Sequence, residues 1–154
     1  LFRSFDDRVD LVAAAILRRA HVLADPISQL PQRAGTRTVK ANLQWFARRA
    51  DRVLEELVPL IAAAFGEPDL LARLRRQMAD ADPAHIATTV VADYLRAEQA
   101  LGRISPSIDP TAAAGTLVSL CHDRAFQRFL RGHEAPKRGR MDREIDFIAN
   151  ALEA

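Results

Sequence analysis

Apolar side chains recur at helical spacing along most of the chain, and no stretch alternates apolar and polar residues as a half-buried strand does. The segments 82–102 and 109–132 each open with Asp-Pro and close with Gly. An aspartate N-cap accepts a hydrogen bond from an unpaired amide, the proline has no amide to leave unpaired, and the glycine can adopt the left-handed conformation that ends a helix. The pattern therefore predicts an all-α fold organised around these two helices.

Four further helices are predicted from the same spacing, over residues 7–25, 38–65, 69–79 and 141–152. Asp7 is the expected N-cap of the first. Pro59 lies inside the second, where a proline removes one backbone hydrogen bond and clashes with the carbonyl of Glu55. We therefore expect a bend at Pro59 rather than the end of the helix. The segment 25–37, with two prolines and a glycine, is the longest predicted loop.

The connection 103–108 is short, so the helices 82–102 and 109–132 should pack as neighbours. The second of them carries two apolar stripes, Ala114, Val118, Cys121, Ala125 and Phe129 on one side and His122, Phe126 and Leu130 on another. A helix that is apolar on several sides needs more than one neighbour to bury it. The sequence therefore predicts that another subunit covers part of this helix.

Composition narrows the class of protein. The chain has 154 residues, 49% of them hydrophobic and 27% charged, which is typical of one globular domain, and no apolar run is long enough to span a bilayer. A net charge of +2 does not by itself indicate a polyanion-binding surface. The single cysteine, Cys121, excludes an internal disulfide framework and fits a reducing cytoplasm. The chain opens without an initiator methionine, so we expect upstream residues to be missing.

Three sequence segments carry a family resemblance. The chain opens with Leu1-Phe2-Arg3-Ser4-Phe5, and Asp7-Arg8-Val9-Asp10-Leu11 follows; further on, residues 94–102 read Tyr-Leu-Arg-Ala-Glu-Gln-Ala-Leu-Gly before Asp109-Pro110. With this order and these helix lengths, the whole chain resembles the TetR family of bacterial transcriptional regulators, read from the last turn of the DNA-recognition helix onward. That family has an aromatic-basic-His-Phe run and a Ser-Lys-Glu-x-Leu helix start in the first two places. The third segment corresponds to the region between its seventh and eighth helices.

The resemblance implies two parts: residues 1–5 as the remnant of a helix-turn-helix DNA-binding domain, and residues 6–154 as the effector-binding and dimerisation domain. Ser4 and Arg8 would then contact DNA phosphates, which position a protein without reading bases. Phe2 stands where the family usually has a tyrosine and offers no hydroxyl. Base contacts would come from upstream helices, so residues 1–154 alone should not bind an operator specifically.

The resemblance further implies a ligand-responsive repressor, acting as a homodimer, with a cavity for a small apolar or amphipathic effector. No cofactor, metal or enzymatic activity is expected. The candidate ligand-binding residues are Trp45, Phe46, Met78, Thr89, Tyr94, His122 and Phe126. The candidate dimer-interface residues lie on the last two helices and are Val118, Phe129, Ile145, Ile148 and Leu152.

Two alternatives remain open at the level of sequence. His122-Asp123, with His85 and either Asp142 or Asp146, resembles the ligand set of HD-type metal phosphohydrolases, although nothing in the spacing enforces convergence. The four histidines form no HxxxH or ExxH pair, so no helix presents two obvious ligands on one face. The second alternative is a helical interaction module without a ligand, which a core free of cavities would favour.

Overall fold

The computed structural model describes residues 3–79, 83–132 and 138–153. Within these residues it contains helices and no strand, so the predicted all-α fold is confirmed. The α-helices are α1 (Arg3–Ala24), α2 (Val39–Ala64), α3 (Pro68–Ala79), α4 (Pro83–Ala100), α5 (Pro110–Arg131) and α6 (Arg138–Glu153). Two short 3-10 helices, η1 (Asp25–Gln29) and η2 (Pro31–Arg33), join α1 to α2.

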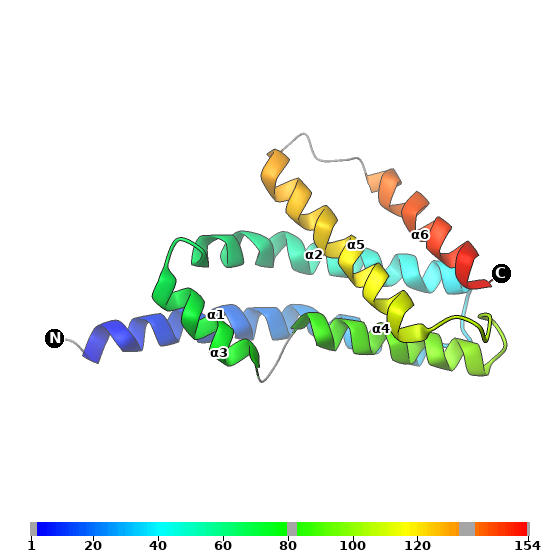
Figure 1. Cartoon of the computed structure of the whole chain (residues 1–154), viewed down its shortest axis with the longest axis horizontal. Coiled ribbons are helices and arrows are strands. Elements are labelled where there is room, and N and C mark those ends of the chain that lie inside the picture. Colours follow the sequence, from blue (N-terminus) through cyan, green and yellow to red (C-terminus); the bar gives the residue numbers. More distant parts are fainter. Residues whose placement is uncertain (1–2, 80–82, 133–137, 154) are drawn as a thin grey trace.

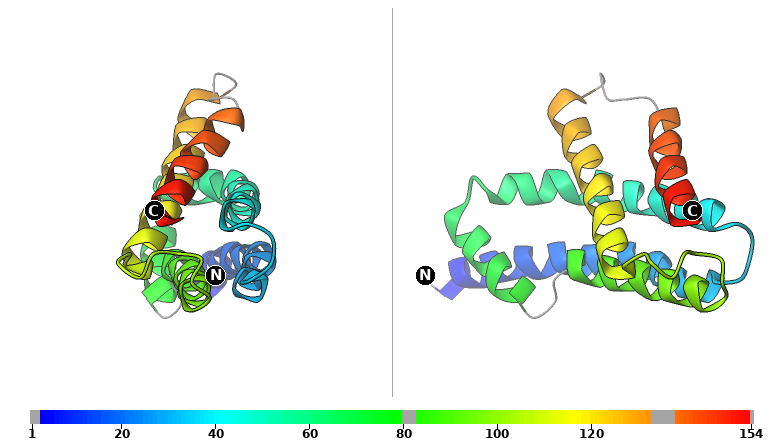
Figure 2. Two further views of the ribbon diagram at one scale, coloured as in Figure 1. Left: turned by 90° about the vertical axis from the view of Figure 1, so that its right-hand side faces the viewer. Right: turned by 45° about the vertical axis from the view of Figure 1, so that its right-hand side comes forward.

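The helices form an elongated base from which one pair projects (Figure 1). Helices α1, α2 and α4 run along the long axis, and α3 crosses α1 at the end where the chain begins. Helix α5 packs against both α2 and α4, and α6 packs against α2. Figure 2 shows α5 and α6 rising together from one side of the base. The predicted contact between α4 and α5 is confirmed.

Local signals in the sequence fix several helix ends. Thr38 caps α2 by accepting a hydrogen bond from the Ala41 amide at 3.1 Å. The Asp109 side chain caps α5 by accepting from the amides of Thr111 and Ala112. After α4, Gly102 has a φ of +70°, and the amide of Arg103 donates to the carbonyl of Glu98 at 3.0 Å. This is the hydrogen-bond pattern of a Schellman motif, which requires a residue that tolerates positive φ.

Three predicted boundaries were wrong. Helix α1 continues from Arg3 through Asp7, because no glycine or proline lies there to interrupt it. The expected loop 25–37 contains η1 and η2, which are held by local hydrogen bonds from side chains and backbone amides. Helix α6 begins at Arg138, three residues before the predicted start. Helix α2 passes through Pro59 without ending, as predicted, while a bend at that residue stays a prediction.

The main core lies between α1, η1, α2, α4, α5 and α6. Its largest fully buried apolar side chains are Tyr94, Phe46, Leu30, Leu43, Leu95, Leu117 and Ile145. A second, smaller cluster joins α1, α2 and α3 through Ala13, Ala64 and Leu74. Burial of these apolar surfaces is the principal stabilising contribution to a fold of this kind. Helix α3 therefore packs on the outside of the base and is separate from the main core.

Candidate functional site

A small apolar cavity lies inside the main core, where five elements meet. It is lined by Ala20 of α1, Ile27 of η1, Ala87 of α4, Phe46, Ala50, Val53, Leu54 and Leu57 of α2, and Val118, Cys121 and His122 of α5. Its volume is about 70 Å³. Since a water molecule takes roughly 30 Å³ in the liquid and drug-sized ligands need a few hundred, the cavity in this conformation has room for a very small molecule.

The cavity wall offers little chemistry beyond apolar contact. Its side chains are aliphatic or aromatic apart from those of Cys121 and His122. Burial, followed by the charge of Asp51, raises the pKa of the Cys121 thiol to about 12. The thiol therefore stays protonated at neutral pH and is a poor nucleophile. His122 is exposed and forms the polar rim of the cavity.

The structure brings together two of the seven predicted ligand-binding residues. Phe46 and His122 line the cavity. Tyr94 is fully buried elsewhere in the core, and Trp45 is partly buried and contacts two arginines on the surface of α2. The other three lie outside the cavity wall: Met78 on α3, Thr89 on α4 and Phe126 on α5. Periodicity identified the apolar face of each helix, but it did not show which residues of that face meet a cavity.

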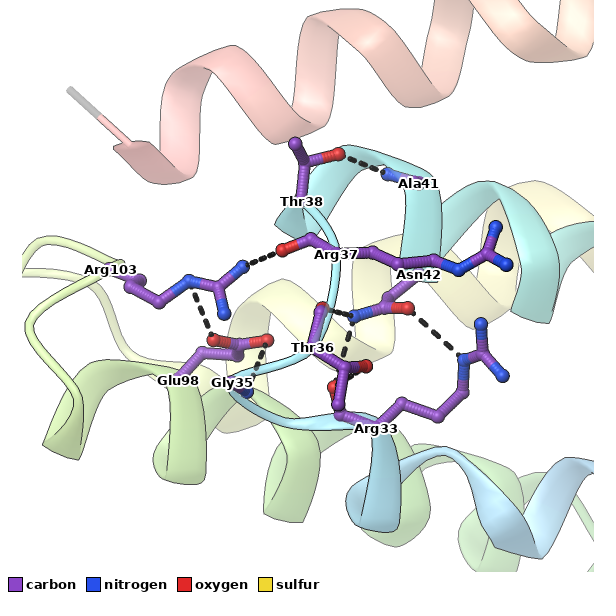
Figure 3. Close-up of polar contacts among 9 residues, drawn as sticks. All are labelled: Arg33, Gly35, Thr36, Arg37, Thr38, Ala41, Asn42, Glu98 and Arg103. Carbon is purple, nitrogen blue, oxygen red and sulfur yellow. Dashed lines mark hydrogen bonds and ion pairs between the residues drawn. The ribbon is translucent and has the colours of Figure 1, made fainter.

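A buried polar cluster where α2 begins and α4 ends was not predicted from the sequence (Figure 3). Asn42 and Glu98 are both fully buried. The Asn42 amide donates to the carbonyls of Thr36, at 2.7 Å, and Arg33, at 3.2 Å, while its oxygen accepts from Nε of Arg33 at 3.1 Å. These bonds attach the segment 33–38 to the first turn of α2.

The carboxylate of Glu98 attaches the same segment to α4. Oε1 accepts from the Gly35 amide at 3.3 Å, and Oε2 lies 3.3 Å from Nε of Arg103, whose Nη2 donates to the Arg37 carbonyl (Figure 3). The Tyr94 hydroxyl lies nearby without a hydrogen bond of good geometry, and burial raises the pKa of Tyr94. The only sequence signals for this cluster were Gly35 and Gly102, which mark the turns on either side of it.

An open groove runs between α5 and α6 on the projecting pair. It is lined by Thr116 and Leu120 of α5 and by Arg143, Glu144, Phe147 and Ile148 of α6, and its volume is about 630 Å³. Phe147 is 76% exposed, the most of any large apolar side chain of the described chain, and Phe126, Phe129 and Leu130 of α5 are exposed as well. The ion pair of Arg124 and Glu144 spans the two helices at 2.9 Å. The projecting pair therefore exposes several large apolar side chains.

The predicted interface residues divide between this surface and the core. Phe129 is exposed and Ile148 lines the groove. Val118, Ile145 and Leu152 are buried within the chain itself, because they face α2 and the rest of the main core. Three of the five predicted interface residues are thus buried within one chain, whereas Phe147, which was not predicted, is exposed.

Comparison with known families decides the class of the chain. Residues 41–152 match the model of the domain described as the C-terminal domain of AefR-like transcriptional repressors, within the TetR family. The chain belongs to the TetR family. No curated protein and no solved structure gives a significant match. The sequence-based resemblance is therefore confirmed.

Membership in the TetR family makes the chain part of a transcriptional regulator, and members of this family are generally not enzymes. The HD-type alternative also lacks its geometry: in the described part of the chain, no three His, Cys, Asp or Glu side chains are grouped to hold a metal ion. Asp142 pairs with Arg48, and Asp146 with Lys40 and Gln44. Among the described helices of this TetR-family chain, none has the length and apolarity needed to cross a membrane.

The predicted DNA-contacting residues of this TetR-family chain lie at the start of α1. Ser4 and Arg8 belong to the first two turns of that helix, and their side chains lie outside what the structure describes. Helix α1 runs without a break from Arg3 across the boundary between residues 5 and 6, so no turn separates the two proposed parts where they are described.

Proposed function

We propose that residues 6–154 are the effector-binding and dimerisation domain of a ligand-responsive repressor that acts in the cytoplasm, with residues 1–5 belonging to its DNA-binding domain. The observation that carries the proposal is the apolar cavity in the core, together with family membership. A cavity in an otherwise close-packed core costs stability, because its lining atoms lose contacts on one side. Its presence is better explained by ligand binding than by folding alone.

The cavity supports an effector that is small and apolar, with one polar group facing His122. Because about 70 Å³ is below the size of usual ligand pockets, binding of a larger effector requires the helices around it to move apart. Helices α2 and α5 supply most of the wall, so the movement would involve them above all. Such a ligand would stabilise a conformation that the free protein populates weakly.

Helix α5 connects the cavity to the proposed dimer surface. Val118, Cys121 and His122 face the cavity, whereas Thr116 and Leu120 of the same helix face the groove beside α6. A helix moves largely as a unit, so a displacement at one face reaches the other. In a dimer, this would change the distance between two DNA-binding domains and hence their fit to adjacent half-sites.

A cavity-filling substitution tests the effector site. Ala87→Leu, on α4, would occupy the cavity, whereas Ala100→Leu adds the same atoms at an exposed position of the same helix. Small apolar compounds that raise the melting temperature of the wild type and of Ala100→Leu should fail to raise that of Ala87→Leu. Compounds that stabilise all three proteins equally would show that the cavity is not the effector site.

The groove and Phe147 support a homodimer in which α5 and α6 pair with their copies. Four helices packed in this way would bury the exposed side chains of Phe126, Phe129 and Phe147. Phe147→Asp should therefore give a monomer instead of a dimer in light scattering. The protein should stay folded, because the substituted position is exposed. The control is Phe65→Asp, which changes another exposed phenylalanine, at the C-cap of α2. A wild type that is monomeric at micromolar concentration would contradict the dimer.

The proposed DNA contacts can be tested in the intact regulator. Arg8→Ala should weaken binding to operator DNA about equally for all sequences, since phosphate contacts carry no base readout. Fluorescence anisotropy with labelled operator measures this effect. Unchanged affinity would remove Arg8 from the interface and leave the effector site unaffected.

A further inference from the structure

Two arginines stack on the only tryptophan of the chain, at the beginning of α2. The guanidinium carbon of Arg33 lies 4.4 Å from the centroid of the Trp45 ring, and that of Arg49 lies 4.0 Å from it. Both guanidinium groups therefore lie within cation–π distance of the same indole ring. The indole therefore holds two cations in fixed positions through cation–π contacts. Arg52 follows Arg49 by one turn and is exposed.

In the part of the chain that the structure describes, no ion pair joins a carboxylate to this cluster, which comprises Arg33, Trp45, Arg49 and Arg52, although Arg52 lines a pocket beside Asp51 and Glu55. The carboxylates of α2 are all engaged by other elements: Asp51 and Glu55 pair with Arg128 of α5, and Glu56 pairs with Arg19 of α1. Arg33 uses its Nε to donate to Asn42, which leaves its Nη groups available.

The positive charges of the cluster repel one another. Partial burial, and then repulsion by Arg52 and Arg33, lowers the pKa of Arg49. An anion placed among these guanidinium groups would reduce that repulsion. A guanidinium over an aromatic ring can still bind a carboxylate through its N–H groups, and Arg33 has its two Nη groups for this.

The location of the cluster favours a protein partner over DNA. Arg33 precedes α2, and Trp45, Arg49 and Arg52 follow from the second turn of that helix to its middle. Helix α2 begins at the end of the base opposite to the start of α1 (Figure 1). Helix α1 has 22 residues and is thus about 33 Å long, so DNA bound near its first turn would not reach the cluster. Tryptophan and arginine are the residue types that contribute most to protein–protein binding energy. The Asn42 bond further holds Arg33 in place before any partner arrives (Figure 3).

We propose that Arg33, Trp45, Arg49 and Arg52 form a docking surface for an acidic segment of a partner protein. Carboxylates of the segment would bind Arg49 and Arg52 along one face of α2, and a third would bind Arg33 beyond the indole edge. The surface is separate from the cavity and from the α5–α6 groove. The proposal therefore does not depend on the effector or on the dimer.

Trp45 provides a direct readout of binding, because no other tryptophan contributes to the emission. A hexaglutamate peptide titrated into the full chain should change the Trp45 fluorescence saturably, and added salt should weaken the binding. Hexaglutamine should leave the emission unchanged. Arg49→Ala and Arg52→Ala should each weaken hexaglutamate binding by about threefold to tenfold. Both residues are at the surface, and circular dichroism verifies that the variants remain folded.

Arg48→Ala is the matched control, because it removes the same charge from the neighbouring position. Arg48 already pairs with Asp142, so its loss should leave hexaglutamate affinity unchanged. Equal weakening by Arg48→Ala would show attraction by net charge alone and would overturn the proposal. Inorganic phosphate or duplex DNA that binds through Arg49 and Arg52 more tightly than hexaglutamate would also overturn it, since the site would then be one for phosphate.

Discussion

Glu98 and Arg103 are joined twice, once through the backbone and once through their side chains. The Arg103 amide donates to the Glu98 carbonyl at 3.0 Å, and Arg103 Nε lies 3.3 Å from Oε2 of a carboxylate that is fully buried. The turn at Gly102 makes both contacts possible, because its positive φ brings the chain back over the end of α4. Glu98 and Arg103 then hold the backbone at Gly35 and Arg37, which leads into α2.

Removal of Arg103 should consequently be costly. Arg103→Ala leaves the buried carboxylate of Glu98 without its cation, which we expect to lower the free energy of unfolding by about 3 kcal/mol. Arg96→Ala is the control, because it breaks an exposed ion pair with Asp93 on the same helix and should cost less than about 1 kcal/mol. Urea denaturation measures both. Similar losses in the two variants would mean that burial of Glu98 has no energetic consequence.

Gly35 should tolerate no side chain. Its φ is +74°, and an added Cβ would lie 3.1 Å from Cδ1 of Leu101, so Gly35→Ala should destabilise the protein by about 1–2 kcal/mol. Gly115→Ala is the opposite case, since that glycine is inside α5 and a Cβ there meets open space. It should stabilise the protein by roughly 0.5–1 kcal/mol. Thermal unfolding of both variants measures the difference, and a shift of the same sign in each would contradict the prediction.

The pKa of Cys121 predicts a loss of stability in alkali. The thiol has a pKa of about 12 in the folded chain against an ordinary value of 9.0, so the folded state keeps its proton longer than the unfolded state does. Stability from this group is full below pH 9 and decreases as the pH rises from 9 towards 12. Denaturant titrations across this range measure the slope.

Cys121→Ala is the control for that slope. It should make the decrease between pH 9 and 12 shallower without abolishing it, since burial raises the pKa of Tyr94 as well. A slope identical to that of the wild type would show that the thiol does not titrate as a buried group.

Asn42 should contribute to both stability and the environment of Trp45. Asn42→Ala removes three hydrogen bonds from a fully buried position and leaves the carbonyls of Arg33 and Thr36 without this donor, which should cost about 2–3 kcal/mol. Arg33 also loses its anchor, so the fluorescence of the stacked Trp45 should change. Asn150→Ala, at an exposed position of α6, should stay within about 0.5 kcal/mol of the wild type and leave the emission unaltered.

The sequence by itself determined the helices and the family. Helical periodicity and the caps at Thr38, Asp109, Gly102 and Gly132 act within a few residues, so they can be recognised without knowledge of the rest of the chain. Where such a signal was weak, as at Asp7, the predicted boundary was wrong. The resemblance of short segments to the TetR family was sufficient to anticipate the family match over residues 41–152.

Only the tertiary structure decided which residues of each apolar face are buried, exposed or next to a cavity. Val118 and Phe129 belong to one predicted stripe of α5, yet the first is 6% exposed and the second 43%, because α2 and α4 cover only part of that helix. Glu98 is separated from Asn42 by more than fifty residues, and its charge gave no sign of burial. A helical stripe specifies the side of the helix on which a residue lies, whereas burial, ion pairing and cavities depend on the neighbour that the fold places on that side.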